Sequence, residues 1–501
     1  MDLVSPSDAR RSVSRVRGVF LRGLGLVFVL AFASLLPQLS SLLGPSGLSP
    51  SAELLGYVRQ VIPGSERYVR LPTLLWWFGA GEGALHGVGL AGLVCGALLV
   101  VNVAPRWALI GAWGCYLSLV SVGGVFLGYQ WDVLILEASL VSFPLTPGHL
   151  LPRGGAVAPL RGAILLPRLL LFRLMVMSGV VKLASGDPTW RDLTALQYHY
   201  WTQPLPNPIA WFANLLPGVI QRASAGVMLF IELGVPFFLF GPRPARLVAA
   251  GLLALLQLGI LATGNYGFFN LLTLVLCVSA LDDGALVRWR IGSPPAAAPA
   301  RVRGRPSLSA GAFVLFAVVY AVLGFSLDLQ RVTGRPMPGV LGTVESAITG
   351  FNSINTYGLF AVMTTERREI LIEGSADGQT WKEYLLPYRP GRVDEAPRFV
   401  APHQPRLDWQ MWFAALSTCE SNPWLIRLQE ELLRGDPTAR GLFRENPFPD
   451  APPRFVRTRF FDYRFTDWHT WRVTGDWWTR TEVGPYCPPL TLENGQLRAV
   501  P

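Results

Sequence analysis

The stretch FRLMVMSGVVKLASGDPTWRDLTALQYHYWTQPLPNP, residues 172–208, decides the fold class. Its first half is apolar enough for a membrane helix, and its second half is a polar and aromatic loop. Lys182 lies near the end of the apolar half, where a charge is costly and so suggests a functional role. The alternative is a lysine whose apolar stem lets its ammonium group reach the headgroups.

Tyrosine and tryptophan, which settle at membrane interfaces, are frequent in the loop after Lys182. We therefore predict that residues 185–208 fold back over this lysine. We also predict that Lys182 lies close to Asp132, because both fall near the outer ends of adjacent apolar segments. The loop residues that we single out are Asp187, Trp190, His199 and Tyr200.

The composition is that of a membrane protein. The 501 residues are 51% hydrophobic and 15% charged, with a mean hydropathy of +0.36, whereas soluble domains average about 25% charged residues. The net charge of +10 comes from arginines in short loops beside apolar segments. This is the positive-inside pattern of membrane proteins, and it favours a lipid bilayer over nucleic acid as the partner.

Nine apolar segments are predicted to be membrane spans, although 131–145 and 268–281 also fit re-entrant helices. Loops 123–130 and 263–267 carry no lysine or arginine, which predicts a cytoplasmic N-terminus and an outer location for residues 328–501. A signal peptide ending near 31–33 is an alternative for the first segment. The nine segments are 23–36, 83–103, 107–122, 131–145, 164–183, 219–240, 245–262, 268–281 and 309–327.

Residues 328–501 are predicted to form a separate α+β domain outside the cytoplasm, after a transmembrane helical domain at 1–327. Alternation on both sides of an Asp-Gly turn predicts a hairpin at 369–388. Residues 405–416 and 423–434 are expected to be helices, and 454–465 a strand. Cys419 and Cys487 could pair in this domain if its compartment is oxidising. The histidines and cysteines do not cluster, so we predict no metal site and no cofactor.

A second motif, PHQPRLDWQMWF at 402–413, carries apolar side chains around most of a helix opening. Such a helix lies in a domain core or docks on something large, such as a membrane or an unfolded client protein. His403 with Asp408 suggests acid–base chemistry, but no nucleophile motif accompanies them, which favours a structural histidine. The motif residues are His403, Gln404, Arg406, Asp408, Trp409 and Trp412.

Charged side chains inside the apolar segments are expected to pair, because an unpaired charge at that depth is costly. Arg173 falls near the middle of its segment, at a depth similar to those of Glu137 and Glu232. We predict that Arg173 pairs with one of these two carboxylates. Ion pairs that hold the helices together are the plainest interpretation of all these charges.

Long strings of this sequence resemble the lipase maturation factor family. They are SGVVKLASGDPTWRDLTALQYHYWTQPLPNP (178–208), TGNYGFFNLLT (263–273), LIEGSADGQTWKEY (371–384), PHQPRLDWQMWFAAL (402–416) and NPFPDAPP (446–453). The resemblance implies a multi-pass membrane protein that helps secreted lipases reach their active fold. Characterised animal members reside in the endoplasmic reticulum membrane, whereas the arginine-rich composition here fits a bacterial cell membrane.

Residues 178–190 also resemble a segment of vitamin K-dependent γ-carboxylases and their bacterial membrane relatives. In those enzymes a lysine at this place is taken as the catalytic base, and Lys182 falls on it. Two hypotheses follow. In the first, the chain is a folding factor whose outer domain binds secreted clients. In the second, it is an intramembrane enzyme with Lys182 as general base and Asp132, His199 or Tyr200 as neighbours. The first is favoured, because the resemblance that supports it covers most of the chain.

Overall fold

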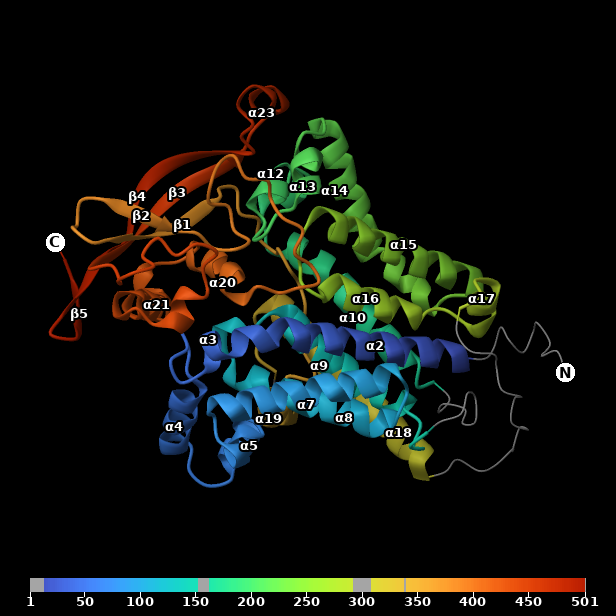
Figure 1. The fold of residues 1–501 in the computed structure, drawn as a ribbon. Coiled ribbons are helices and arrows are strands. Elements are labelled where there is room, and N and C mark those ends of the chain that lie inside the picture. The colour runs from blue at the N-terminus through green and yellow to red at the C-terminus, as the bar shows by residue number, and fades with distance from the viewer. Residues whose placement is uncertain (1–12, 152–161, 292–307, 338, 501) are drawn as a thin grey trace.

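The fold combines a bundle of long helices with a five-stranded sheet at one end of it (Figure 1). The computed structural model describes residues 13–151, 162–291, 308–337 and 339–500. All nine apolar segments are helical over most of their described length. The corresponding helices are α2 (Ser14–Leu35), α7 (Glu82–Val100), α8 (Pro105–Val122), α9 (Gln130–Ser142), α10 (Leu165–Ala184), α14 (Gly218–Leu233), α15 (Arg243–Thr263), α16 (Phe269–Val278) and α18 (Leu308–Thr333).

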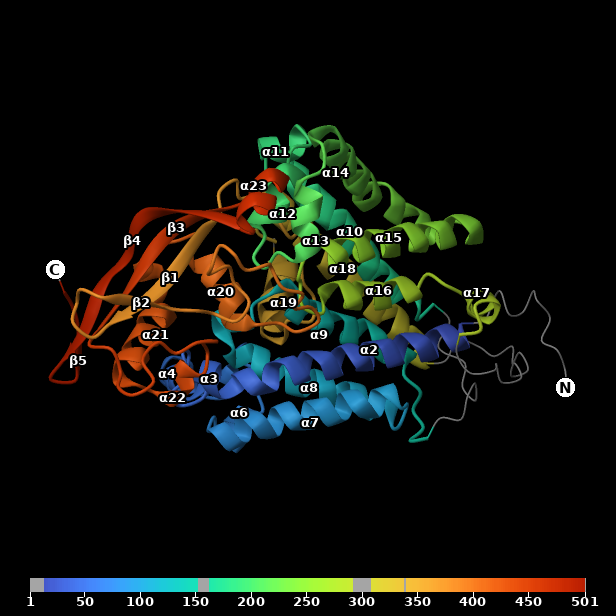
Figure 2. The ribbon, with the colours of Figure 1, turned by 45° about the horizontal axis from the view of Figure 1, so that its top comes forward.

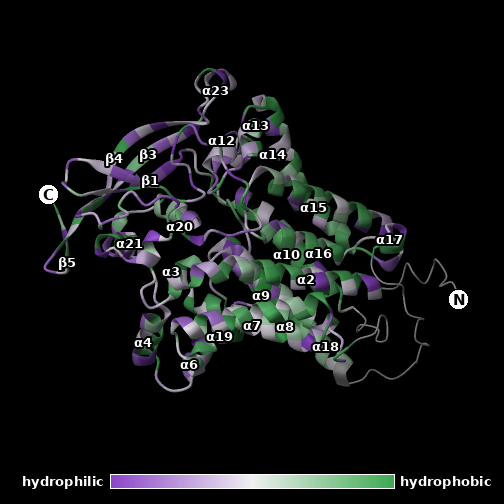
Figure 3. Ribbon diagram, viewed as in Figure 1, coloured by the Kyte–Doolittle hydropathy of each residue, from purple (hydrophilic) through white to green (hydrophobic). Residues whose placement is uncertain are grey.

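Five of these segments, among the described residues, are long and apolar enough to cross a membrane. They are Ser14–Leu43, Glu82–Val100, Gly218–Phe240, Arg243–Thr263 and Ala310–Thr333. At 13 and 10 residues, α9 and α16 are shorter than the roughly 20 residues that a spanning helix needs. The structure therefore shows a helical membrane domain with five candidate spans among its described residues, whereas nine spans were predicted. Hydrophobic residues dominate these helices, whereas the sheet is more polar (Figure 3).

Shorter helices connect the long ones. Beside the sheet end lie α3 (Leu39–Leu43), α4 (Ser51–Val61), α5 (Glu66–Arg70) and α6 (Leu75–Phe78). The loop after Lys182 contains α11 (Pro188–Arg191), α12 (Leu196–Thr202) and α13 (Pro208–Asn214). At the opposite end lies α17 (Asp283–Arg288), and α19 (Gly339–Ile348) follows α18. The bundle therefore has two distinct ends, one of which carries the sheet.

Glycines allow the first two long helices to pack closely. A Cβ atom on Gly92 of α7 would lie 2.1 Å from the Phe32 ring of α2. One on Gly25 of α2 would lie 2.9 Å from the carbonyl oxygen of Gly96. Small residues at such positions let helix backbones approach each other in a membrane, where van der Waals packing drives association.

The N-terminus of α2 is fixed at the end of the bundle away from the sheet. The Asp283 carboxylate accepts hydrogen bonds from the backbone N–H groups of Ser14, Arg15 and Val16 at 3.0, 2.9 and 3.0 Å. A carboxylate is favourable there because it satisfies unpaired donors and faces the positive end of the helix dipole. The neighbouring Asp282 pairs with Arg243, at the start of α15, at 2.8 Å.

The residues after α18, which we call the outer domain for their predicted location, are built on an antiparallel sheet with strand order β2-β1-β3-β4-β5. The predicted hairpin is confirmed, with β1 and β2 joined by a turn in which Gly378 has a φ of +77°. The predicted strand at 454–465 corresponds to β3. The long strand β4 was not predicted. The strands are β1 (Arg368–Ser375), β2 (Trp381–Tyr384), β3 (Phe455–Phe465), β4 (Trp478–Glu493) and β5 (Gln496–Ala499).

Helices α20 (Arg406–Ala414) and α21 (Pro423–Arg434) lie along one face of the sheet, between it and the membrane domain (Figures 1 and 2). Both were predicted from the sequence, α21 with these same bounds. A disulfide joins Cys419 to Cys487 and so ties the segment before α21 to β4. The remaining helices of this domain are the short α22 (Pro437–Arg440) and α23 (Trp468–Thr474).

One buried ion pair connects the two domains. Arg406 of α20 holds both carboxylate oxygens of Asp132 in α9, at 2.9 and 2.8 Å, and both side chains are almost fully buried. Tyr116 of α8 donates a further hydrogen bond to Asp132 at 2.5 Å. The predicted contact between Lys182 and Asp132 is therefore wrong, because the outer domain supplies the cation.

The hydrophobic core is continuous across this junction and joins α2, α9 and α16 to α20 and α21. Helix α18 also runs to Thr333, beyond the predicted boundary at residue 327. The outer domain is therefore packed directly on the helices rather than linked by a flexible connector.

We predict that Asp132→Asn destabilises the protein by about 3–5 kcal/mol, since Arg406 is left as a buried charge without a counter-ion. The change is nearly isosteric, so the loss reflects charge rather than volume. Thermal melts in detergent measure it. Limited proteolysis should show that the outer domain becomes easier to cleave away from the membrane domain.

The control is Glu53→Gln, which breaks a second ion pair between the two domains. Glu53 of α4 meets Arg427 of α21 at 3.0 Å, but the Glu53 side chain is 64% exposed. An exposed pair contributes about 0–1 kcal/mol, so this variant should melt close to the parent. Equal melting of both variants would show that the Asp132 pair does not hold the junction.

Candidate functional site

Lys182 pairs with Glu232 because α10 and α14 approach closely one turn earlier. A Cβ atom on Gly179 would lie 2.7 Å from the Leu233 side chain and 3.2 Å from the Cβ of Glu232. The missing side chain lets α14 pack against α10, and residue 182 follows on the same helix face. The carboxylate of Glu232 is thereby brought to the lysine.

The ion pair is buried and symmetrical. Lys182 Nζ lies 2.9 Å from each oxygen of Glu232 and donates to the backbone oxygen of Ser178 at 3.1 Å. The side chains are 7% and 5% exposed. Glu232 was predicted as a partner of Arg173, but it lies on Lys182 instead, one residue before the end of α14.

The loop after Lys182 folds back over it, as predicted. The Trp190 ring centroid lies 5.3 Å from Lys182 Nζ, and Trp190 is almost fully buried. Asp187 fixes this loop: it caps α11 by accepting from the Thr189 N–H at 2.8 Å and accepts from the Met363 N–H at 2.6 Å. The loop over Lys182 is therefore fixed by Asp187, which precedes α18, and by Met363, which follows it.

His199 lies in α12, near the same lysine, and its tautomer follows from its partners. Gln203 uses its amide nitrogen on two backbone oxygens, so its side-chain oxygen accepts the hydroxyl proton of Tyr266 at 2.7 Å. The Tyr266 oxygen must then accept from Nε2–H of His199, at 2.9 Å. Nδ1 keeps its lone pair and has no hydrogen-bond partner among the described residues.

Burial and, to a smaller extent, the nearby charge of Lys182 together lower the pKa of His199 to about 4. The imidazole is therefore neutral near pH 7. Its ring stacks on Tyr266, and Phe360 meets its face edge-on.

These groups line a cavity of about 690 Å³ between α10, α14 and α15. Its polar end consists of Lys182, Glu232, His199 and Tyr266, and the rest of its lining is mainly apolar. Tyr200 and Trp190 of the covering loop also line it. Asp132 does not, because it lies at the domain junction. The cavity has the size and the mixture of lining groups expected of a ligand site.

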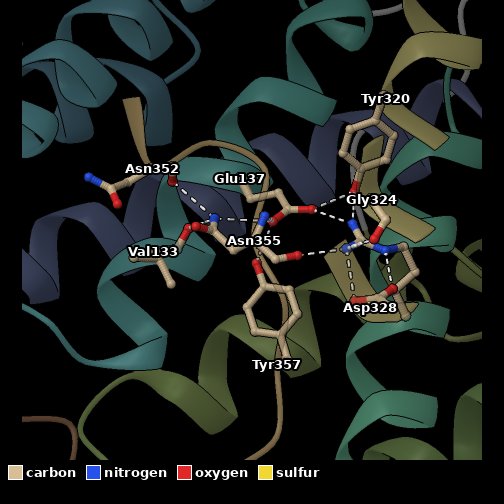
Figure 4. A network of polar contacts seen from close by, with 9 residues as sticks. Val133, Glu137, Tyr320, Gly324, Asp328, Asn352, Asn355 and Tyr357 are labelled. Atoms are coloured by element: carbon tan, nitrogen blue, oxygen red, sulfur yellow. Dashed lines mark hydrogen bonds and ion pairs between the residues drawn. The ribbon is translucent and has the colours of Figure 1, made fainter. Parts of the chain in front are cut away.

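A second polar network surrounds Glu137, deeper in the bundle (Figure 4). One Glu137 oxygen accepts from Arg173 and from the Tyr320 hydroxyl, both at 2.8 Å. The other accepts from the Tyr357 hydroxyl at 2.7 Å and from the Asn355 N–H at 2.7 Å. The predicted ion pair between Arg173 and Glu137 is thus present. These contacts join α9, α10 and α18 to one another and to the segment that contains Asn355 and Tyr357.

Asp328 completes this network and was not predicted. It binds Arg173 at 2.8 and 3.1 Å, and a Cβ atom on Gly324 would lie 2.5 Å from the guanidinium group. Sequence reasoning missed it because residue 328 was placed in the outer domain. The sequence does contain a signal for it. Asp328 directly follows the apolar segment 309–327, and if the helix continues past residue 327 this aspartate is buried and needs a cation.

Helix α20 is buried, and its residues contact the membrane domain. Trp409 is 3% exposed and meets the rings of Trp131 and Tyr129 at 4.8 and 5.7 Å. Trp412 donates its indole N–H to the Thr202 backbone oxygen at 2.8 Å. The core-helix interpretation agrees with this burial, and a client surface formed by these side chains does not.

His403 and Asp408 have different partners, so the structure does not join them into an acid–base pair. His403 Nδ1 lies 2.9 Å from the Ser34 hydroxyl of α2. Asp408 accepts from the Tyr388 N–H at 2.9 Å, and burial raises its pKa to about 6. Gln404 also contacts Ser34, through its backbone N–H at 2.8 Å. These residues anchor the start of α20 on α2.

Both parts of the chain match described domains. Residues 15–288 match the lipase maturation factor transmembrane domain, and residues 353–488 match the lipase maturation factor C-terminal domain. The chain belongs to the lipase maturation factor family. Lipase maturation factor 1 of Homo sapiens is 34% identical over 507 residues, which cover 95% of this chain and 88% of that protein.

Two further members of the lipase maturation factor family show similar agreement. Lipase maturation factor 2 of Xenopus tropicalis is 32% identical, over 95% of this chain and 82% of its own length. Lipase maturation factor 2 of Rattus norvegicus is 34% identical, over 96% of this chain and 84% of its own length. No solved structure matches the chain.

We predict that Arg173→Ala costs this lipase maturation factor homologue about 3–5 kcal/mol, because Glu137 and Asp328 then stay buried without a cation. Thermal melts of the detergent-solubilised protein measure the loss. The double variant Arg173→Ala with Asp328→Ala should recover part of it, since one of the two unpaired charges is removed. A melting temperature unchanged in the single variant would contradict the network.

Proposed function

We propose that the chain is an integral membrane maturation factor for secreted proteins, with lipases as its clients. The observation that carries the proposal is the match of residues 15–288 and 353–488 to the two lipase maturation factor domains, together with alignment of 95% of the chain to lipase maturation factor 1 of Homo sapiens. The relatives' names supply the client class. In this proposal the helices anchor the protein in the membrane, and the outer domain binds the client.

The proposal includes the nine-segment arrangement, with α9 and α16 as short buried crossings. Contacts at the two ends of the bundle support it. Arg106 and Thr146, which flank α8 and α9, meet at 3.1 Å at the end where α2 begins. Asn265, just before α16, accepts from the Val400 N–H at 2.8 Å at the end that carries the outer domain. Each segment would then run from one end to the other.

The outer domain is proposed to lie outside the cytoplasm, in a bacterial cell membrane if the source is bacterial. The arginines flanking the apolar segments favour this orientation. The Cys419–Cys487 disulfide supports it, because such bonds persist in oxidising compartments.

A maturation factor needs apolar surface that an incomplete client can reach. The end of α20 offers it: Phe413 is 40% exposed and Leu416 is 50% exposed, one turn later. Aromatic and aliphatic side chains in such a position are suited to transient contact with unfolded chains. Burial of Trp409 and Met411 on the same helix keeps this exposed end in place.

We predict that the double change Phe413→Ser with Leu416→Ser lowers the yield of active secreted lipase several-fold while the protein still accumulates in the membrane. Leu416 is 50% exposed, whereas Phe413 is 40% exposed and its ring meets those of Tyr129 and Trp412 at 6.0 and 5.0 Å, so the membrane level of the variant is measured together with the lipase yield. The assay compares lipase activity with lipase antigen in the medium of cells that lack the endogenous factor.

The matched control is Val483→Ser, which removes an apolar side chain of similar exposure, 48%, from β4. It should leave lipase secretion unchanged. If the parent chain itself fails to raise the active lipase fraction, the maturation proposal is overturned. If the parent chain raises the active lipase fraction and the double variant raises it equally, the client surface lies elsewhere on the outer domain.

The second candidate function is an intramembrane enzyme with Lys182 as general base. The cavity beside Lys182 and the neutral His199 favour it. Against it stands the pairing of Lys182 with both oxygens of Glu232, since a base needs a free lone pair.

Lys182→Arg separates the two candidates. Arginine keeps a cation for Glu232 but cannot act as a base near neutral pH. We predict that the variant keeps both its membrane level and the yield of active lipase. Lys182→Ala should lose protein instead, because the unpaired Glu232 costs about 3–5 kcal/mol. If the Lys182→Arg protein accumulates normally in the membrane but yields no active lipase, the enzyme hypothesis is favoured.

A further inference from the structure

The cavity beside Lys182 opens on the apolar outer surface of two candidate spans. Its mouth is lined by Val219 and Val227 of α14 and by Leu255 of α15, which are 74%, 57% and 64% exposed. Both helices belong to segments long and apolar enough to cross a membrane. In a bilayer these side chains face acyl chains, so the opening leads sideways into lipid.

The polar end of the cavity is balanced in charge. Among its described lining residues, Lys182 is the one cation and Glu232 the one carboxylate, and they neutralise each other. His199 is uncharged near pH 7. A phosphate or carboxylate headgroup would therefore meet no free positive charge, and burying it there would be costly. An uncharged headgroup meets no such cost.

Hydrogen-bonding groups are nevertheless concentrated at this end. Tyr200 and His199 are among its lining residues, and the lone pair of His199 Nδ1 has no partner among the described residues. These groups match a head that both donates and accepts, such as hydroxyl and ester oxygens. The apolar remainder of the cavity suits a hydrocarbon chain.

We propose that this cavity binds one uncharged, long-chain lipid with hydroxyl and ester oxygens in its head, which enters from the bilayer between α14 and α15. The head lies at Lys182, Glu232 and His199, beneath Trp190, and the chain lies along Met228 and Ile231 toward the mouth. This inference goes beyond the proposed function and does not rest on it.

The test uses the full chain in its native membrane and a monoacylglycerol whose acyl chain carries a photoreactive diazirine. Irradiation before solubilisation, followed by peptide mass spectrometry, locates the label. The expected result is labelling of peptides from 219–232 and 255–263, reduced by excess monoolein and much less by oleate. Labelling spread evenly over all apolar helices would overturn the site.

Gly259 of α15 gives a variant that fills the cavity. It lines the cavity, and a Cβ added there meets no atom within 4 Å. Gly259→Trp should therefore remove most of the specific label without disturbing the helix packing. Gly251→Trp is the matched control, because Gly251 is on the same helix, equally free of neighbours, and outside the cavity lining. It should keep the label.

Glu232→Gln tests the headgroup chemistry. It leaves the Lys182 cation without a counter-ion, so oleate should then compete better than monoolein, the reverse of the parent's order. If the variant does not accumulate, the order of competition in the parent still decides the question. Stronger competition by oleate than by monoolein in the parent would overturn the uncharged head, and full labelling of Gly259→Trp would overturn the cavity as the site.

Discussion

Buried charge in an apolar bundle is the constraint on which the rest of this structure depends. Three cations, Arg173, Lys182 and Arg406, are each held by a carboxylate on another segment. An unpaired charge there would cost several kcal/mol, so each pair fixes two segments at a set distance and register. Together the pairs connect α9, α10, α14, α18 and α20, and the apolar side chains fill the space between them.

The sequence could predict which groups need partners and, for Arg173, one of the correct ones. Its pairing with Glu137 followed from depth along the segments. Depth does not say which face of a helix a residue occupies, and this is why Lys182 was assigned to Asp132 instead of Glu232. The glycine at 179, three residues before the lysine, marks the face on which α14 packs, but that meaning is visible only once the neighbour is known.

The outer domain was predicted well where its pattern is local and poorly where it meets the membrane domain. The hairpin followed from alternation on both sides of an Asp-Gly turn, and α20 and α21 followed from the pattern of apolar residues along each segment. The contacts of Arg406 with Asp132 and of Asn355 with Glu137 join residues 274 and 218 positions apart, and no local pattern encodes such a distance. Composition also placed residue 328 outside, although Asp328 continues the polar network of the bundle.

The same burial limits where clients can be received. A factor that holds unfinished proteins has to expose apolar surface without losing its own fold, and apolar surface is safe to expose only on a rigid element. Helix α20 meets both conditions: Arg406 and Trp409 are buried in the junction, whereas Phe413 is 40% exposed at its end. Because Arg406 is paired with Asp132 and Trp409 is buried, the start of α20 is fixed on the membrane domain. In the two proposals, a lipid would bind in the cavity lined by Trp190 and a client would bind at Phe413 and Leu416, which do not line that cavity, so the two would not compete for the same residues.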